Sequence, residues 1–489
     1  MSFVPLPVDQ FGNVSIGLGD SAALDSFQRL RVSQSSTRYD SQQEYGLDTL
    51  RSWDCTANGV LPTILSPNGS VSSAGNAVGP RNVNTRMTPI TSSATNGHYA
   101  VLQSRQYVRY VPGFSHLVLI TGVFATATSP AASITVRTAT SGAASDLNTY
   151  AQANWYDKFD GTGPSGITLD LTKTQILFIG AQWLGVGRVI VGFDINGRLY
   201  PAMFFNHANT LTVPYTQTFN LPARLEARTS GSTTITRTGY FDGDNGVFLQ
   251  TVNTGAGGTM NFVCCSIQSE GSLEARGFPQ SQNPGAATIS VTTRRPVFSI
   301  RPAATFQGIT NRAHIEIEDY WLTAGSINSI YEVVIGGTLT GASWLAVGVP
   351  LSVANLIVGV RYRILTLGTT TNGQWNTAGA TGTAVVGQSF VALTTAVGTG
   401  TVTPENSCSE YDISATAIVG GGTVYCGEII SGSGSVRGSS GGATDFRNPL
   451  VLSKIDALAA TQNSISIVCT SVGAASSIRA GMNWHEQVN

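Results

Sequence analysis

The chain has 489 residues and a formal net charge of −1, from 27 Lys and Arg against 28 Asp and Glu. Only 11% of its residues are charged, against about 25% in ordinary soluble domains, while 42% are hydrophobic and 55 are glycine. This balance excludes a highly charged disordered chain, and it argues against nucleic-acid binding, because no excess of positive charge is present to displace counterions from phosphates. Helical bundles are richer in Ala, Glu, Lys, Leu and Arg, so the composition indicates a large, neutral β protein.

The first 45 residues differ from the rest of the chain. Two prolines and three glycines interrupt Val4 to Gly19, and a polar run follows from Gln34 to Gln43. We therefore expect residues 1–45 to form an extended arm, interrupted by a short amphipathic anchor at 25–33. The apolar residues of this anchor are Phe27, Leu30 and Val32.

From residue 46 onward, β-rich runs alternate with turn signals. The clearest case is Asn196-Gly197, between runs at 188–195 and 198–205. Asn-Gly accepts the positive φ angles of a tight hairpin turn, so this stretch predicts a β-hairpin. Further strands are predicted at 107–111, 117–124, 134–137, 175–179, 221–227, 246–252, 260–268, 287–292, 297–301, 314–322, 331–335, 413–418, 423–430, 465–470 and 478–484.

The pattern within these runs favours sheets with one buried and one wet face. In the run from His314, Ile315 and Ile317 point one way and the glutamates between and after them the other way. The Gly/Ser/Asn-rich stretches 66–95 and 431–444 are predicted as loops, and 451–460 as a short helix or a strand. Many short strands separated by turns predict an all-β fold, with an antiparallel β-sandwich or jelly-roll body.

No group of residues points to a catalytic or metal centre. Residues 438–442 match the pattern GxSxG, but without the strand–turn–helix context of a nucleophile elbow. The acidic turn at 242–246 lacks the spacing of an EF-hand loop, and Asp157 and Asp160 are interpreted as turn formers. The scattered histidines are expected to be structural: His98, His116, His207, His314 and His485. We therefore predict no enzyme, no cofactor and no metal.

Aromatic clusters at 155–159 and 204–205 could stack on a sugar ring, but sandwich core is the favoured interpretation. The six cysteines show no CxxC spacing and are expected to be free thiols, with Cys264 and Cys265 on opposite faces of a strand. The chain has no secretory pattern at its start and no run of about 18 apolar residues, so we expect no membrane insertion.

Longer motifs resemble a family of tailed-bacteriophage virion structural proteins of the tail or appendage type. The resembling stretches are 25–33, 39–42, 160–166, 182–188, 205–209, 220–224, 269–271, 274–277, 338–343 and 483–486. One departure is that 239–248 resembles a segment that the family would place before the motif at 160–166, not after it.

A second, local resemblance is to a small β module of phage tail and fibre proteins. It covers 358–370, 375–380, 386–390 and 398–400, and it interrupts the larger family between Val347 and Cys408. The ends of such an insertion lie close together at a surface loop, so the module should project from the body.

These resemblances imply a four-part organisation. The expected parts are an N-terminal arm (1–45), a main β region of one or two sandwiches (46–349), an inserted β module (350–404) and the return of the main β region (405–489). The inserted module is the expected exposed, exchangeable surface. Whether it binds a host surface glycan or only decorates the particle is left open.

The implied function is structural: a virion component in the tail, baseplate, collar or a fibre-like appendage, with host attachment as an added role. Its partners would be other virion proteins and further copies of itself, for which a trimer would suit a fibre. The N-terminal arm would dock on a neighbouring subunit by strand addition, with Phe27, Leu30 and Val32 as its assembly residues. The alternative is that these side chains pack on the arm's own body. One alternative is a capsid decoration or head-fibre protein. A second is a glycan depolymerase, which would require paired carboxylates about 5–9.5 Å apart in a groove. The family implies no catalytic residues.

Overall fold

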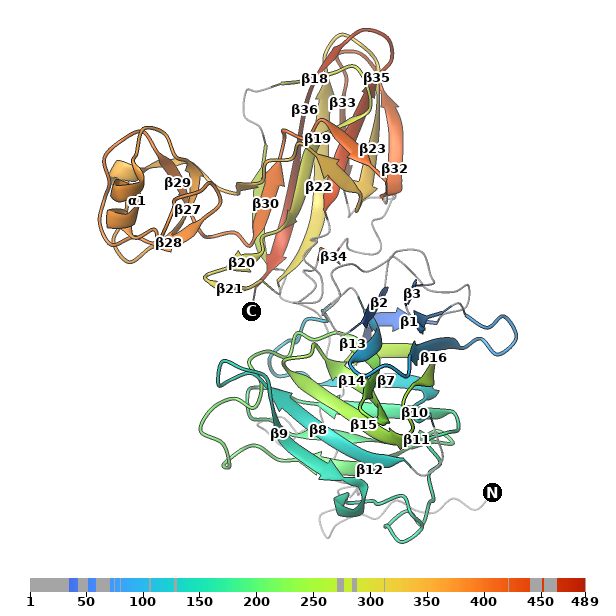
Figure 1. The fold of residues 1–489 in the computed structure, drawn as a ribbon. Helices are drawn as coiled ribbons and strands as arrows, with labels where there is room; N and C mark the ends of the chain where they lie inside the picture. The colour runs from blue at the N-terminus through green and yellow to red at the C-terminus, as the bar shows by residue number, and fades with distance from the viewer. Residues whose placement is uncertain are drawn as a thin grey trace, which may run out of the picture.

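The structure is a computed structural model. It describes residues 35–42, 52–58, 71–73, 75–79, 81–104, 107–126, 130–270, 277–283, 288–311, 313–420, 422–439, 451–452 and 464–488. Within these ranges the regular structure is almost entirely antiparallel β, with one α-helix and two short 3₁₀ turns at Gln152–Asn154 and Val353–Asn355. The predicted fold class is confirmed. Two sandwiches and a small module make up the described chain (Figure 1).

The first sandwich packs two sheets around one core that contains side chains from Tyr39 to Ile267. One sheet has the strand order β12 (Arg198–Phe205), β11 (Val189–Ile195), β10 (Gln175–Ala181), β7 (His116–Val123), β16 (Gly258–Ser269), β5 (Thr88–Ser92), β4 (Asn76–Val78) and β3 (Val71–Ser73), with β1 (Ser36–Ser41) also paired to β16. The facing sheet has the order β2 (Ser52–Asn58), β6 (His98–Ser104), β13 (Ala223–Ser230), β14 (Thr233–Phe241), β15 (Gly246–Thr254), β8 (Ala131–Thr138) and β9 (Ser145–Ala151).

The second sandwich has its own core, which contains side chains from Ile289 to Trp484. Its first sheet has the order β17 (Phe278–Gln282), β36 (Ser476–Gln487), β22 (His314–Ala324) and β33 (Ser435–Ser439), with β18 (Ile289–Val291) on β36 and β34 (Val451–Leu452) on β22. Its second sheet has the order β25 (Leu345–Ala346), β30 (Ser409–Asp412), β19 (Arg295–Pro302), β35 (Ile465–Ser471), β23 (Ser329–Ile335) and β32 (Thr423–Ile430). Two ribbons flank it: β20 (Thr305–Phe306) with β21 (Ile309–Thr310), and β24 (Thr338–Thr340) with β31 (Ala417–Val419). The described residues after 405 thus belong to the second sandwich.

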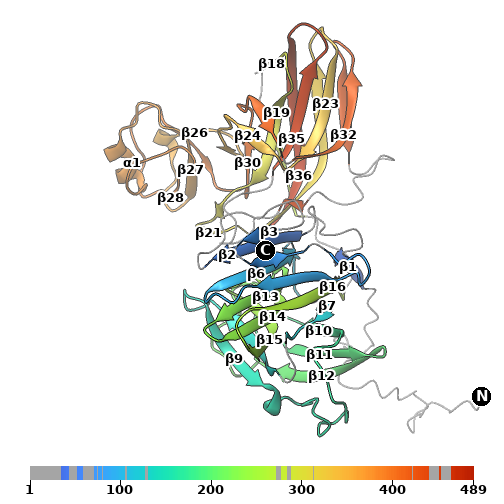
Figure 2. The ribbon, with the colours of Figure 1, turned by 45° about the vertical axis from the view of Figure 1, so that its right-hand side comes forward.

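The third body is the small module. Its sheet has the order β26 (Leu351–Ser352), β29 (Thr401–Pro404), β27 (Arg361–Thr366) and β28 (Ser389–Val391), beside the helix α1 (Asn372–Ala378). Tyr362, Trp375 and Phe390 fill its core. The strands on either side of the insertion, β25 and β30, pair with each other, which brings the two ends of the module together. Figures 1 and 2 show the module standing to one side of the second sandwich, away from the first.

Local sequence signals account for much of this arrangement. Asn196 and Gly197 have φ angles of 56° and 78° and connect the hairpin of β11 and β12, as predicted. Ile315 and Ile317 lie in the second core while Glu318 is exposed, so the predicted alternation is confirmed. The helix was not predicted. It begins with a capping box in which Thr371 and Gln374 satisfy each other's backbone N–H groups.

Several expected elements are wrong. The run 107–111 forms only one bridge, from Val108 to Leu221. The stretch 66–95, expected as a loop, contains β3, β4 and β5, and the stretch 431–444 contains β33. For β5 and β33, pairing with the distant strands β16 and β22 overrides weak local propensity, whereas β3 and β4 pair with each other as a local hairpin. Of the expected strand 413–418, only the last two residues belong to β31.

The last part of the expected arm is a strand of the first sandwich rather than an extended arm. Residues 36–41 form β1 on the edge of β16, and Tyr39 is buried in the first core, so this part belongs to the chain's own body. The assembly residues Phe27, Leu30 and Val32 lie outside the described residues.

Candidate functional site

The junction between the module and the second sandwich is built around Arg363 on β27. Its Nη1 donates to Glu410 Oε1 at 2.6 Å, and its Nη2 and Nε donate to Glu405 Oε1 at 3.0 and 3.3 Å. Nη2 also donates to the Thr305 carbonyl oxygen. Arg363 is only 4% exposed. One module side chain is therefore tied to both the linker that follows β29 and the sheet of the second sandwich.

A second arginine extends this network. Arg301 on β19 donates from Nε and Nη2 to Glu410 Oε2, at 3.0 and 2.9 Å. Its guanidinium carbon lies 4.1 Å from the ring centroid of Trp344. Glu410 thus accepts from arginines of two different bodies, one through each oxygen. Partly buried, multiply bonded pairs of this kind hold one geometry better than surface pairs do.

Beneath the junction lies another buried carboxylate, Glu486 on β36. Its Oε1 accepts from the hydroxyls of Ser407 and Ser409, both at 2.5 Å, and from Trp484 Nε1 at 3.0 Å. Its Oε2 accepts from the backbone N–H of Cys408 at 2.9 Å. These bonds fix the linker between β29 and β30 to the opposite sheet of the second sandwich.

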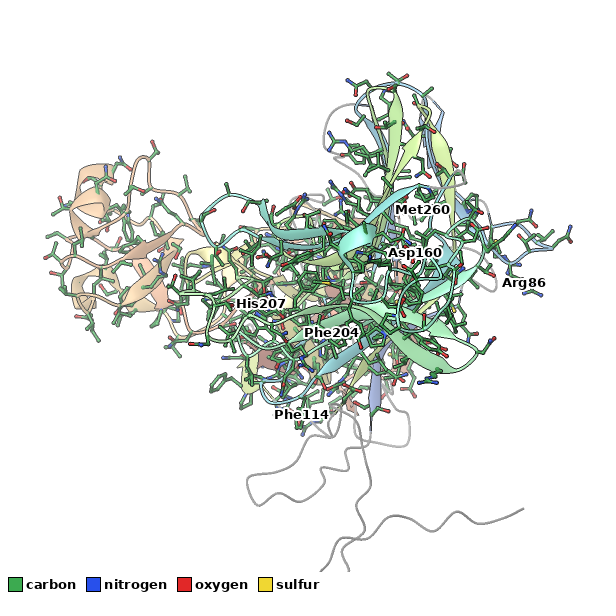
Figure 3. The ribbon with its side chains drawn as sticks, turned by 90° about the horizontal axis from the view of Figure 1, so that it is seen from below. Arg86, Phe114, Asp160, Phe204, His207 and Met260 are labelled. Carbon is green, nitrogen blue, oxygen red and sulfur yellow. The ribbon has the colours of Figure 1, made fainter. Side chains whose placement is uncertain are left out.

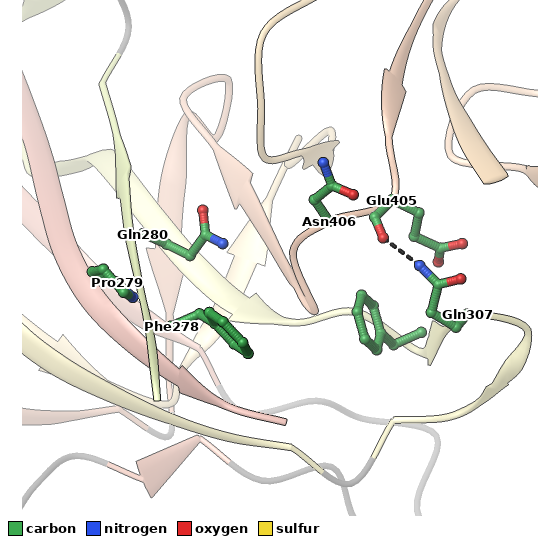
Figure 4. A pocket seen from close by; sticks show the side chains of 7 residues that line it. Phe278, Pro279, Gln280, Gln307, Glu405 and Asn406 are labelled. Atoms are coloured by element: carbon green, nitrogen blue, oxygen red, sulfur yellow. Dashed lines mark hydrogen bonds between the residues drawn. The ribbon is translucent and has the colours of Figure 1, made fainter. Parts of the chain in front are cut away.

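A cleft of about 390 Å³ opens beside this junction. Among the described residues its lining includes Phe278, Pro279, Gln280, Phe306, Gln307, Glu405 and Asn406. Figure 4 shows the β17 residues on one side and Gln307, Glu405 and Asn406 on the other. The amide nitrogen of Gln307 donates to the Glu405 carbonyl oxygen at 2.6 Å. The volume is in the range of small-molecule sites, about 300–1,000 Å³.

The acidic residues that the sequence analysis considered are turn formers, as interpreted there. Asp242 Oδ1 accepts from the backbone N–H groups of Asp244 and Asn245. Asp157 accepts from backbone N–H groups of its own loop, and Asp160 from Thr162. Among the described residues, no group of three or more His, Cys, Asp or Glu side chains could hold a metal ion. Ser440 of the GxSxG match lies outside the described ranges.

The histidines lie apart from one another, and most are buried. His116 packs among the rings of Tyr110, Phe219 and Tyr240, and burial lowers its pKa to about 4. Burial also lowers the pKa of His314 to about 3. His314 Nε2 contacts the carbonyl oxygen of Tyr107, so it lies where the two sandwiches touch.

The aromatic clusters are divided between core and surface. Trp155, Phe159 and Phe205 belong to the first core, as favoured. Tyr156 is 58% exposed, and its ring lies 5.2 Å from that of Phe204 in an edge-on arrangement. Figure 3 shows Phe204 on the first sandwich, seen from below.

The cysteines whose side chains are described are free thiols. Cys265, Cys408 and Cys469 are buried, and burial raises the pKa of the Cys469 thiol to about 12. Cys265 lies in the first core while Cys264 is half-buried, in keeping with opposite faces of β16.

The junction residues Arg363, Glu405 and Glu410 were not predicted from the sequence. A signal was nevertheless present, because Arg361 and Arg363 are the only charged residues between positions 350 and 404. Any acidic partner of these two arginines must lie outside the otherwise uncharged module, and Glu405 and Glu410 follow it directly. The pairing itself depends on the fold.

No protein-family model matches this chain, and neither a search of the curated proteins nor one of the solved structures finds a match. Within the part of the chain that the structure describes, no helix is long and apolar enough to cross a membrane.

Proposed function

We propose that this chain is a structural component of a bacteriophage virion, in the tail, baseplate, collar or a fibre-like appendage, and that it presents its small module outward. The observation that carries this proposal is the mounting of the module. The module stands off the second sandwich, and buried bonds from Arg363 to Glu405 and Glu410 set its orientation. A module held in this way is suited to display.

Composition and sequence resemblance support the same function. Motifs spread from residue 25 to residue 486 resemble virion proteins of tailed phages. The low content of charged residues suits broad contacts with other virion proteins and with further copies of the chain, because charged residues are depleted at interface cores.

The test is to locate the chain in the particle. Virions that encode it are purified, labelled with antibody fragments raised against residues 350–404, and imaged by electron microscopy. Label on the tail tip, collar or fibres is the expected result. Fragments pre-incubated with the full-length protein serve as the control and should give no label.

Two outcomes contradict the proposal. Label spread over the head would show that the chain is a capsid decoration protein instead of a tail or appendage protein. Absence of the chain from purified particles, checked by mass spectrometry, would remove the virion assignment altogether.

A further inference from the structure

We propose that the cleft between β17, the β20–β21 ribbon and the linker at Glu405–Asn406 binds a neutral glycan. Phe278 and Phe306 would supply apolar surface for a sugar ring. The amides of Gln280, Gln307 and Asn406 would bond its hydroxyl groups. The inference deepens the proposed function and rests on it only for the source of the glycan, which would be the host surface.

The described part of the lining is effectively uncharged. Among the described lining residues Glu405 is the one ionisable residue, and its side chain is 0% exposed. Its Oε1 accepts from Arg363, and its Oε2 accepts from the Ser389 hydroxyl at 2.6 Å. The nearby Arg361 lies with Nε 4.0 Å from Glu405 Oε2. Because Glu405 offers the cleft only its backbone, and Arg361 lies against that carboxylate, the chemistry favours a neutral ligand over an anion or a cation.

Aromatic rings beside planar amides match the chemistry of a sugar. A sugar ring has an apolar face, against which a phenyl ring packs, and hydroxyl groups that both donate and accept. Each amide likewise offers two N–H donors and an acceptor oxygen. Phe278 is 69% exposed, and this apolar surface is available to a ligand.

The geometry of the β20–β21 ribbon adds a second argument. Gln307 and Gly308 have φ angles of 51° and 82°, as in a tight type I′ turn. Asn, Asp or Gly usually occupies the first of these positions, so a glutamine there is strained. Its amide is fixed by the bond to the Glu405 carbonyl oxygen, which holds the side chain at the cleft. Strain of this kind is typical of functional positions.

The site lies at the base of the module rather than on it. The module's own aromatic side chains, Tyr362, Trp375 and Phe390, are all buried in its core. The described surface of the module therefore offers no aromatic ring for stacking, whereas the cleft at its junction does.

The experiment uses the full-length protein and immobilised polysaccharides as probes. The neutral probes are dextran, mannan and galactan, and the acidic probe is alginate. We expect retention on at least one neutral polysaccharide and a loss of about tenfold or more in affinity for Phe278→Ala and for Gln280→Ala. The matched controls are Tyr156→Ala, an exposed aromatic on the first sandwich, and Ile309→Ala, an exposed apolar residue of the β20–β21 ribbon outside the lining. Both controls should bind within about twofold of the parent protein.

The proposal is overturned if no neutral polysaccharide retains the parent protein, if alginate binds best, or if the cleft variants bind as the controls do. It is also overturned if Phe278→Ala changes the sedimentation of the chain and leaves retention intact, because the cleft would then be a subunit contact. Virion labelling is independent of these results. Tail label without glycan binding rejects the cleft alone, and glycan binding by a chain absent from virions rejects the virion assignment alone.

Discussion

Replacement of Arg363 by methionine should destabilise the junction strongly. Methionine keeps much of the buried apolar length but removes every bond to Glu405, Glu410 and the Thr305 carbonyl oxygen. Two largely buried carboxylates then lose a partner. Breaking one side of a buried ion pair costs about 3–5 kcal/mol, mostly because the remaining charge stays desolvated. We therefore expect a loss of this size in the unfolding free energy of the second sandwich and module.

The assay is urea unfolding combined with limited proteolysis at the linkers around residues 350 and 405. Arg363→Met should lower the midpoint of the corresponding transition and speed release of the module. The matched control is Arg294→Met, which breaks an exposed pair with Glu332 in the same sandwich and should cost about 0–1 kcal/mol. Adding Glu405→Gln to Arg363→Met should cost less than the sum of the two single changes. Equal, small costs for Arg363→Met and Arg294→Met would refute the reasoning.

Three further predictions concern single buried or strained positions. The pKa of His116 is about 4 in the folded chain, below its ordinary 6.5, so the unfolded chain takes up the proton first. Its contribution to stability is complete above about pH 6.5 and falls as the pH drops toward 4, with a loss of about 2 kcal/mol at pH 5. Urea unfolding of the first sandwich at pH 7 and pH 5 measures this loss, and an equal pH dependence in His116→Gln would contradict it. Glu486→Gln replaces one carboxylate oxygen by an N–H donor at a site where four donors already point at the carboxylate. We therefore expect the free energy of unfolding, measured in urea, to fall by about 1–3 kcal/mol. An unchanged midpoint would contradict this and would show that the serine hydroxyls reorient without cost. Gly197→Ala should lower the free energy of unfolding by about 1–2 kcal/mol. The cause is its φ of 78° alone, because no heavy atom lies within 4 Å of an added Cβ. Calorimetry measures this loss, and Gly231→Ala, at φ 59° and equally open, should show a similar one.

The elements that could be predicted are those with a local cause. The hairpin at Asn196-Gly197 follows from a dipeptide that accepts positive φ angles, and the alternation around Ile315 follows from the two-residue repeat of a strand. The acidic turns follow from Asp side chains that bond to backbone N–H groups a few residues away. Each of these causes acts within about ten residues.

The missed elements have distant causes. β5 pairs with β16, and β33 pairs with β22, although their own Gly- and Ser-rich surroundings predict loops. A partner strand supplies the hydrogen bonds and packing that local propensity does not. The same reason explains why residues 36–41 at the end of the expected arm form β1: they pair with the edge of β16.

The sequence by itself determined the all-β class, the tight turns and a segment, residues 350–404, whose only two charged residues are arginines. Only the tertiary structure decided that the strands divide into two sandwiches, and that β25 and β30 are the strands whose pairing joins the ends of the insertion. It also decided that Arg363 meets Glu410, 47 positions away, and that Phe278 and Gln307 line one cleft. Local patterns set backbone conformation, whereas the meeting of distant side chains depends on how complete sheets pack.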